Sequence, residues 1–226
     1  MQATKSYNYN TFDAGLYALD AFAGPKVGEK AVDFTATTLD GRTVKLSDYF
    51  GKPVILETGS FTCPQYVARI NPMNQFAAQY PEFEFLVLYV REAHPGDKIG
   101  EHTLVEDKTH LAQRTREEER ENRSIIVDDL NGTVHQMYGS LPNMLYIIGA
   151  DGTVLARSDW NDTSAVAKSL EKLQAGQSLD TQQYGFRPVA PPVLLRVLTR
   201  AGWDALFDFL VNLPSLIWGH IKAALK

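Results

Sequence analysis

Residues 53–64 read Pro-Val-Ile-Leu-Glu-Thr-Gly-Ser-Phe-Thr-Cys-Pro, and this stretch decides the fold class. Its first six residues are rich in apolar and β-branched side chains, which predicts a buried strand. A loop from Gly59 carries Cys63, and residues 67–80 then place apolar side chains at helical spacing. The sequence therefore predicts Cys63 at the carboxyl end of a core strand, where the next helix begins. In open α/β sheets, sites form at this edge.

Elements on either side of this unit complete an α/β pattern. Residues 35–38 and 43–46 flank an Asp-Gly turn and predict a β-hairpin. After the helix, the sequence predicts strands at 83–90, 125–128, 145–148 and 154–157, and helices within 101–123 and at 163–175. The order is βαβαββα after the N-terminal hairpin. This order predicts a mixed sheet with helices on both faces.

Four regions are expected along the chain. They are an N-terminal segment at 1–24 with a short helix near 14–23, an α/β domain at 25–180, a linker at 181–192 and a helical appendage at 193–226. The linker is rich in Gln, Pro and Gly.

The appendage carries Leu, Phe and Trp at helical spacing, and Pro214 is expected to break it. Because basic residues are not in excess, docking on the domain or on a second copy of the chain is favoured. The alternative is peripheral contact with a membrane interface, with Trp203 and Trp218 as anchors.

Composition limits the function classes. The chain has 226 residues, 44% of them hydrophobic, and a net charge of −5, which gives no basic field for a nucleic acid. One cysteine cannot form an intramolecular disulfide, which fits a reducing compartment. No apolar signal segment or long apolar run is visible, so a cytoplasmic location is expected. No Cys/His pair has metal-ligand spacing, so no metal site is expected.

Cys63 is the candidate nucleophile. The reactive form of cysteine is the thiolate, and a helix N-terminus favours it through unpaired N–H groups and the positive end of the helix dipole. Pro64 suits the first helical turn, and Ser60 and Thr62 are expected to donate hydrogen bonds to the thiolate. The alternative is a buried structural cysteine. The strand–loop–helix placement favours the reactive thiol.

Four sequence blocks resemble the iodothyronine deiodinases, in the order found in that family. They are residues 59–64, similar to the active-site loop with Cys63 at the selenocysteine position; 89–94, ending in Glu-Ala-His; 102–108, similar to a second histidine motif; and 141–148, similar to a strand entered through a proline. The resemblance extends over about residues 25–175. It identifies the chain as similar to the redoxin branch of the thioredoxin superfamily and implies a thioredoxin-like fold.

The resemblance implies a set of roles. Cys63 would be the nucleophile, His94 and His102 would donate protons or orient the substrate, and Glu92 would support them. Pro142 would face the thiol through a cis peptide bond. The implied reaction is reductive dehalogenation of an iodinated phenol, with no bound cofactor and with an external thiol as reductant. Histidine suits the proton transfer because it titrates near neutral pH.

The sequence also departs from the family. Cysteine stands in place of selenocysteine. The loop between His94 and His102 is short and lacks the Gly-Trp expected after Asp97. Tyr66 occupies the second position of a Cys-x-x-Cys motif, so no internal resolving thiol exists. Tyr66 is expected to line the pocket one turn after the cysteine.

Two other functions remain open. One is a one-cysteine peroxiredoxin, which acts on a peroxide. Ser60, three residues before the cysteine, is acceptable in the active-site motif of such enzymes. However, Leu56 stands at the position of the motif's proline, and Pro142 stands where these enzymes carry an arginine. A non-catalytic module would hold an aromatic ligand or a partner without turnover.

His110 and His135 are expected at the surface.

Overall fold

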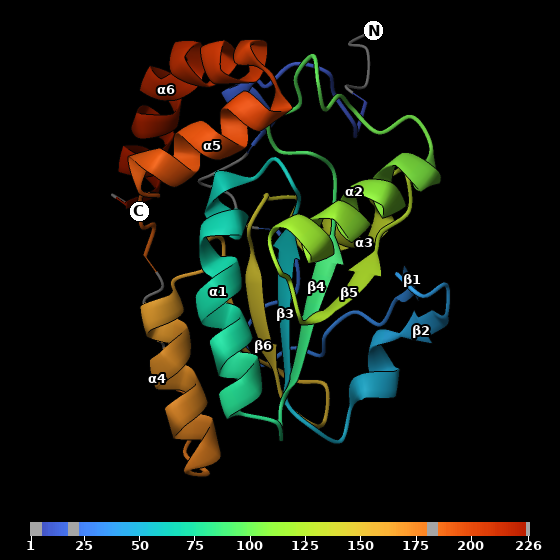
Figure 1. The fold of residues 1–226 in the computed structure, drawn as a ribbon. Helices are drawn as coiled ribbons and strands as arrows, with labels where there is room; N and C mark the ends of the chain where they lie inside the picture. The colour runs from blue at the N-terminus through green and yellow to red at the C-terminus, as the bar shows by residue number, and fades with distance from the viewer. Residues whose placement is uncertain (1–5, 18–22, 180–184, 225–226) are drawn as a thin grey trace, which may run out of the picture.

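A computed structural model of the chain describes residues 6–17, 23–179 and 185–224 (Figure 1). Within them, one mixed sheet has the strand order β2-β1-β5-β4-β3-β6-β7. The strands are β1 Thr35–Thr38, β2 Thr43–Lys45, β3 Val54–Gly59, β4 Glu84–Tyr89, β5 Ser124–Val127, β6 Leu145–Ile148 and β7 Val154–Ser158. The helices are α1 Pro64–Gln79, α2 Val105–Glu118, α3 Thr133–Met137, α4 Thr163–Gln174, α5 Pro191–Ala201 and α6 Trp203–Ala224, with short 3-10 helices η1 Ala14–Leu16 and η2 Leu46–Tyr49.

The centre of the sheet is parallel and fully covered. Strand β3 pairs in parallel with β4, and β4 with β5, while β6 runs antiparallel to β3. All six residues of β3 are buried. Helices α1, α2 and α4 cover one face of the sheet (Figure 1), and side chains of α3 and η2, among them Val134 and Leu46, pack on the other. The predicted fold class, the Asp-Gly hairpin and the strand–loop–helix unit are confirmed.

The observed helices agree with those predicted from the sequence except at a few points. Helix α1 begins at Pro64, directly after Cys63, as predicted, and α4 is capped by the side chain of Asp162. The predicted helix at 14–23 appears only as η1, and residues 18–22 lie outside the described residues. Helix α3 was not predicted, because its five residues are too short for periodicity to register.

His135 lies in α3 and is fully buried, so the prediction that it is a surface residue is wrong. Its Nδ1 lies 2.8 Å from the hydroxyl of Tyr7, and its Nε2 lies 2.7 Å from the carbonyl oxygen of Leu141. These two partners, of which Tyr7 is distant in sequence, compensate the ring for the water it loses. His110 is exposed on α2, as expected.

The C-terminal helices α5 and α6 pack across the end of the domain where β3 and β4 finish (Figure 1). They are separated at Gly202, whose φ of +148° and proximity to Asp97 exclude a side chain: a Cβ there would lie 2.0 Å from the Asp97 carboxylate. The predicted break at Pro214 is wrong, since α6 continues through it. The proline removes one backbone hydrogen bond, but Leu213 and Leu216 on either side of it both pack toward the domain.

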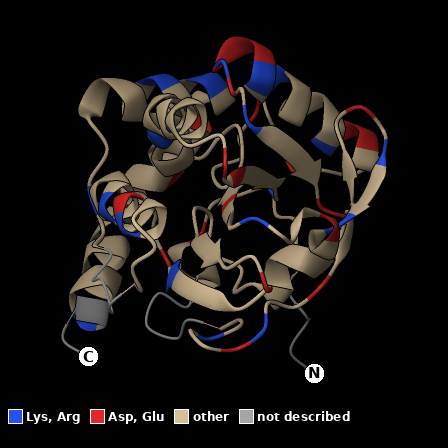
Figure 2. Ribbon diagram, turned by 90° about the horizontal axis from the view of Figure 1, so that it is seen from below, with Lys and Arg blue, Asp and Glu red and all other residues tan. Residues whose placement is uncertain are grey.

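The outer side of the C-terminal pair is apolar and exposed, whereas its inner side is buried. The buried residues are Val197, Leu198, Ala201 and Ala205. Exposed large side chains include Trp203, Phe207, Leu210, Val211 and Trp218. Among the described residues, no helix has the length and apolar character needed to cross a membrane. Elsewhere, Figure 2 shows basic and acidic residues intermixed around the molecule.

A buried ionic cluster joins the core strands to the region after α2. Arg123 donates to Glu57 at 2.5 Å and to both carboxylate oxygens of Glu121, at 2.8 and 2.6 Å. Asn143 and Asn161 each donate to the other oxygen of Glu57 at 2.7 Å. The side chains of Arg123, Glu57 and Glu121 have no exposed surface, so each charge depends on its partners.

Candidate active site

Cys63 is the N-cap residue of α1 and is only 2% exposed. Burial raises the pKa of its thiol to about 12, although the backbone N–H groups of Tyr66 and Gln65 act in the opposite direction. The prediction of a lowered thiol pKa is therefore wrong for this site. The helix N-terminus is present, but removal of water from the thiolate outweighs it.

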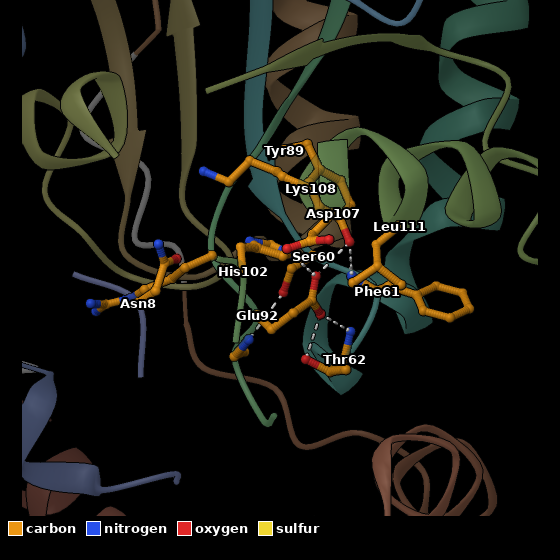
Figure 3. A network of polar contacts seen from close by, with 12 residues as sticks. Asn8, Ser60, Phe61, Thr62, Tyr89, Glu92, His102, Asp107, Lys108 and Leu111 are labelled. Carbon is orange, nitrogen blue, oxygen red and sulfur yellow. Dashed lines mark hydrogen bonds and ion pairs between the residues drawn. The ribbon is translucent and has the colours of Figure 1, made fainter. Parts of the chain in front are cut away.

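Glu92 holds the loop that carries the cysteine (Figure 3). Its Oε2 accepts hydrogen bonds from the backbone N–H of Thr62 at 2.8 Å and from the Thr62 hydroxyl at 2.6 Å, while its Oε1 accepts from the hydroxyl of Tyr89 at 2.6 Å. The Tyr89 hydroxyl in turn accepts the N–H of Phe61 at 3.0 Å. The Thr62 hydroxyl is thus committed to Glu92, and the prediction that it donates to the thiolate is wrong. Ser60 Oγ accepts the N–H of Ala93 at 3.2 Å.

His102 lies behind the cysteine loop and pairs with Glu92. Its Nε2 is 3.2 Å from Glu92 Oε1, and both side chains are fully buried. Burial alone would raise the pKa of Glu92, but His102, Thr62 and Tyr89 together bring it below its ordinary value. His102 does not line the cavity next to Cys63, so the geometry gives it a positioning contact with Glu92 in place of a contact with substrate.

Unlike His102, His94 lines the cavity next to Cys63 with its ring. It packs between Phe12, with ring centroids 4.3 Å apart, and Phe209 of α6, at 5.6 Å. Its Nδ1 is buried without a hydrogen-bond partner among the described residues. Burial lowers the pKa of His94 to about 3, although Glu92 acts to raise it. The imidazole is therefore neutral at neutral pH, contrary to the expectation that it titrates there.

A cavity of about 330 Å³ joins Cys63 to His94. Before residue 180 its walls are Phe12, Tyr17, Cys63, Pro64, Gln65, Ala93, His94, Pro142 and Trp160. After residue 184 they are Phe186, Pro188, Val189, Leu194, Phe209, Leu213, Leu216, Ile217 and His220. Nearly all of these side chains are apolar, and the volume is typical of a small-molecule site.

The structure brings together Cys63, His94 and Pro142 at this cavity, with Glu92 and His102 behind it. The wall residues after 184 were missed as site residues. The helical apolar pattern predicted that the appendage docks, but it did not say on which part of the domain. Tyr66 points away from the cavity and donates to Glu121 at 2.8 Å, so the prediction that it lines the pocket is wrong.

Pro142 lines the cavity as predicted, but the peptide bond before it is trans. The carbonyl of Leu141, which belongs to that bond, accepts from Thr58 Oγ1 at 3.2 Å and lies 2.7 Å from His135 Nε2. These contacts hold the carbonyl in the orientation of the trans bond, which is also the ordinary form before proline. The predicted cis bond is therefore wrong.

A sequence model of the iodothyronine deiodinase family matches residues 6–173. The chain belongs to the iodothyronine deiodinase family. The match includes the cysteine loop, Glu92, His94 and His102, and it ends before the C-terminal helices that close the cavity.

Individual deiodinases are similar to this family member over part of their length. Thyroxine 5-deiodinase of Gallus gallus is 32% identical over 143 residues, which are 58% of this chain and 55% of that protein. The human thyroxine 5-deiodinase is 26% identical over 187 residues, 75% of this chain and 59% of that protein. The chain thus spans somewhat more than half the length of the curated relatives it matches.

Solved structures share the fold of this deiodinase family member. An uncharacterized conserved protein from Geobacillus kaustophilus has a TM-score of 0.60 at 18% identity, with 73% of this chain and 94% of that chain covered. The thioredoxin domain of a thiol-disulfide oxidoreductase from Bacteroides vulgatus has a TM-score of 0.53 at 16% identity, with 66% and 99% covered. The fold is thioredoxin-like, and family and fold together support a thiol-dependent redox function.

Proposed function

We propose that the protein is a reductive dehalogenase that removes iodine from a phenolic substrate through Cys63. One observation carries the proposal: a buried thiol and an imidazole without a hydrogen-bond partner at Nδ1 share one apolar cavity of about 330 Å³. An iodinated aromatic ring fits such walls, because burying its apolar surface is favourable. Membership of the iodothyronine deiodinase family supports the same chemistry.

In the first half-reaction, the Cys63 sulfur attacks the iodine of the substrate. A sulfur–iodine bond forms and the carbon–iodine bond breaks, with its electron pair remaining on the ring carbon. His94 accepts the thiol proton and transfers it to that carbon. The sum is ArI + E–SH → ArH + E–SI, so no proton from solvent is required.

Both groups are neutral before the reaction, since the pKa of the Cys63 thiol is about 12 and that of His94 is about 3. Proton transfer from the free thiol to the imidazole is uphill by these values, so in this mechanism it is coupled to formation of the sulfur–iodine bond, which makes the S–H proton more acidic. The shift of the proton to carbon removes the charge from the apolar cavity. Isolated charge is costly there.

An external thiol completes the cycle in two exchanges. The first, E–SI + RSH → E–S–S–R + HI, releases iodide. The second, E–S–S–R + RSH → E–SH + RSSR, restores the cysteine and leaves the reductant oxidised. Cys63 is the sole cysteine of the chain, so the second thiol comes from outside it.

The test compares the wild type with Cys63→Ser in the presence of dithiothreitol. Each is given an iodophenol or iodothyronine in one series and hydrogen peroxide in another. Release of iodide by the wild type alone is expected. Peroxide consumption without iodide release would assign a one-cysteine peroxidase instead, and inactivity in both series would leave a binding module.

A further inference from the structure

The C-terminal helices complete the cavity, although they lie outside the part of the chain matched by the family. Half of the wall comes from residues after 184, including Phe209, Leu216 and His220 of α6. Half of the surface that the cavity offers to a ligand is therefore built by residues outside the family match.

The C-terminal helices are fixed directly to the cysteine loop. Arg200 of α5 donates to the carbonyl oxygen of Phe61, and its guanidinium lies 3.5 Å from the centre of the Phe61 ring. The loop after His94 is held as well, because the N–H groups of Lys98 and Ile99 donate to the carbonyl of Ala201 at 2.9 and 3.1 Å. These contacts hold α5, and at the start of α6 the Asp204 carboxylate accepts the N–H of Asp97 at 3.0 Å. Helix α6 is thereby held at the cavity that Cys63 also lines.

His220 brings a polar ring to the wall that α6 supplies. Its ring stacks on Phe186, with centroids 4.0 Å apart and planes at 25°, and it lies 5.3 Å from the ring of Trp160. All three rings line the cavity. They form an aromatic slot in the cavity wall that contains one imidazole.

Two other polar side chains of the wall, those of Tyr17 and Gln65, already have partners, whereas Cys63 and His94 are assigned to the proposed reaction. The hydroxyl of Tyr17 is hydrogen-bonded to that of Tyr9, and Gln65 Oε1 accepts from Arg69 at 3.0 Å. Within the described residues, the ring nitrogens of His220 have no hydrogen-bond partner in the protein. A neutral imidazole whose ring nitrogens are free can donate a hydrogen bond to a ligand hydroxyl or accept one from it.

We propose that His220 recognises the phenolic hydroxyl of the substrate while the ring lies against Phe186 and Trp160 and the halogen is directed to Cys63. This inference rests on the proposed function for its substrate class. It makes His220 a specificity-determining residue, which favours binding of a phenol over binding of the corresponding ether, whose oxygen carries no hydrogen. A site with a dedicated hydrogen-bonding partner discriminates in this way because the partner stays unpaired with the wrong ligand.

The experiment measures equilibrium binding in the Cys63→Ser background, where no turnover occurs. Dissociation constants for 4-iodophenol and for its methyl ether, 4-iodoanisole, are determined by isothermal titration calorimetry. The comparison includes His220→Phe, which keeps the stacked ring, and His220→Gln, which keeps a donor and an acceptor. His110→Phe is the matched control, since His110 is exposed on α2.

We expect the parent to bind the phenol roughly threefold to tenfold more tightly than the ether, the range of one neutral hydrogen bond. His220→Phe should lose this preference and keep its affinity for the ether, whereas His110→Phe keeps the preference and His220→Gln retains part of it. An unchanged preference in His220→Phe overturns the inference, and so does a parent protein without any preference. Failure of the proposed function is seen separately, as absence of iodide release from the wild type.

Discussion

The carboxylate of Glu92 accepts the backbone N–H of Thr62 at 2.8 Å, which ties the end of β4 to the residue directly before the cysteine. The same carboxylate accepts the Thr62 hydroxyl and pairs with His102. One buried acid thus fixes the loop that holds Cys63. The arrangement assigns to Glu92 a positioning role, because it does not itself line the cavity.

Glu92→Gln is expected to lower both stability and turnover. The amide has the size of the carboxylate but loses its charge and one acceptor, so the free energy of unfolding should fall by about 1–3 kcal/mol. Iodide release should fall with it, because the loop is less firmly held. Guanidinium unfolding and turnover assays measure both. Glu84→Gln is the control, since Glu84 makes only a 3.5 Å surface pair with Lys52.

The stability loss in Glu92→Gln should also depend on pH. The pKa of Glu92 is held below its ordinary value of 4.5, so the carboxylate stabilises the fold fully above that pH. Its contribution disappears as the pH falls through the lowered pKa. The difference in unfolding free energy between wild type and variant should therefore narrow in acid. A difference that is constant from pH 7 into acid would contradict the lowered pKa.

Alkylation of Cys63 should reveal its raised pKa. With a thiol pKa of about 12, the rate of reaction with iodoacetamide should rise about tenfold per pH unit between pH 7 and 10, because only the thiolate reacts. Mass spectrometry follows the modification. The unfolded protein should instead level off near the ordinary cysteine pKa of about 8.5. A plateau at that pH in the folded protein would show that burial does not control the thiol.

His94→Phe separates proton transfer from binding. Phenylalanine keeps the packing between Phe12 and Phe209 but cannot carry a proton, so turnover should fall about 10²–10⁴-fold. Binding of 4-iodophenol to this variant, measured in the Cys63→Ser background, should change little. His110→Phe serves as the exposed control. Undiminished iodide release by His94→Phe would remove this histidine from the mechanism.

Arg123→Met tests the buried ionic cluster. The substitution leaves Glu57 and Glu121 buried without their cation, which should cost about 3–5 kcal/mol of unfolding free energy. Chemical denaturation provides the measurement. Lys52→Met, at an exposed pair, should change stability by about 0.5 kcal/mol or less. An equally small effect at Arg123 would mean that the cluster is not a stabilising unit.

The sequence by itself determined the fold class and the place of the cysteine. Hydrophobic periodicity over residues 53–80 and the Asp40-Gly41 turn are local signals, and local signals decide where strands, turns and helices form. The four blocks that resemble the deiodinases were also readable without a structure, and the family match agrees with them.

Only the tertiary structure decided the surroundings of the cysteine. The pKa of Cys63 follows from desolvation by every segment packed around it, including helices more than 100 residues away. For the same reason, the burial of His135, the commitment of the Thr62 hydroxyl to Glu92 and the position of His220 at the cavity were hidden from the sequence. Each depends on contacts between distant segments, and periodicity, which is a property of neighbours along the chain, carries no information about them.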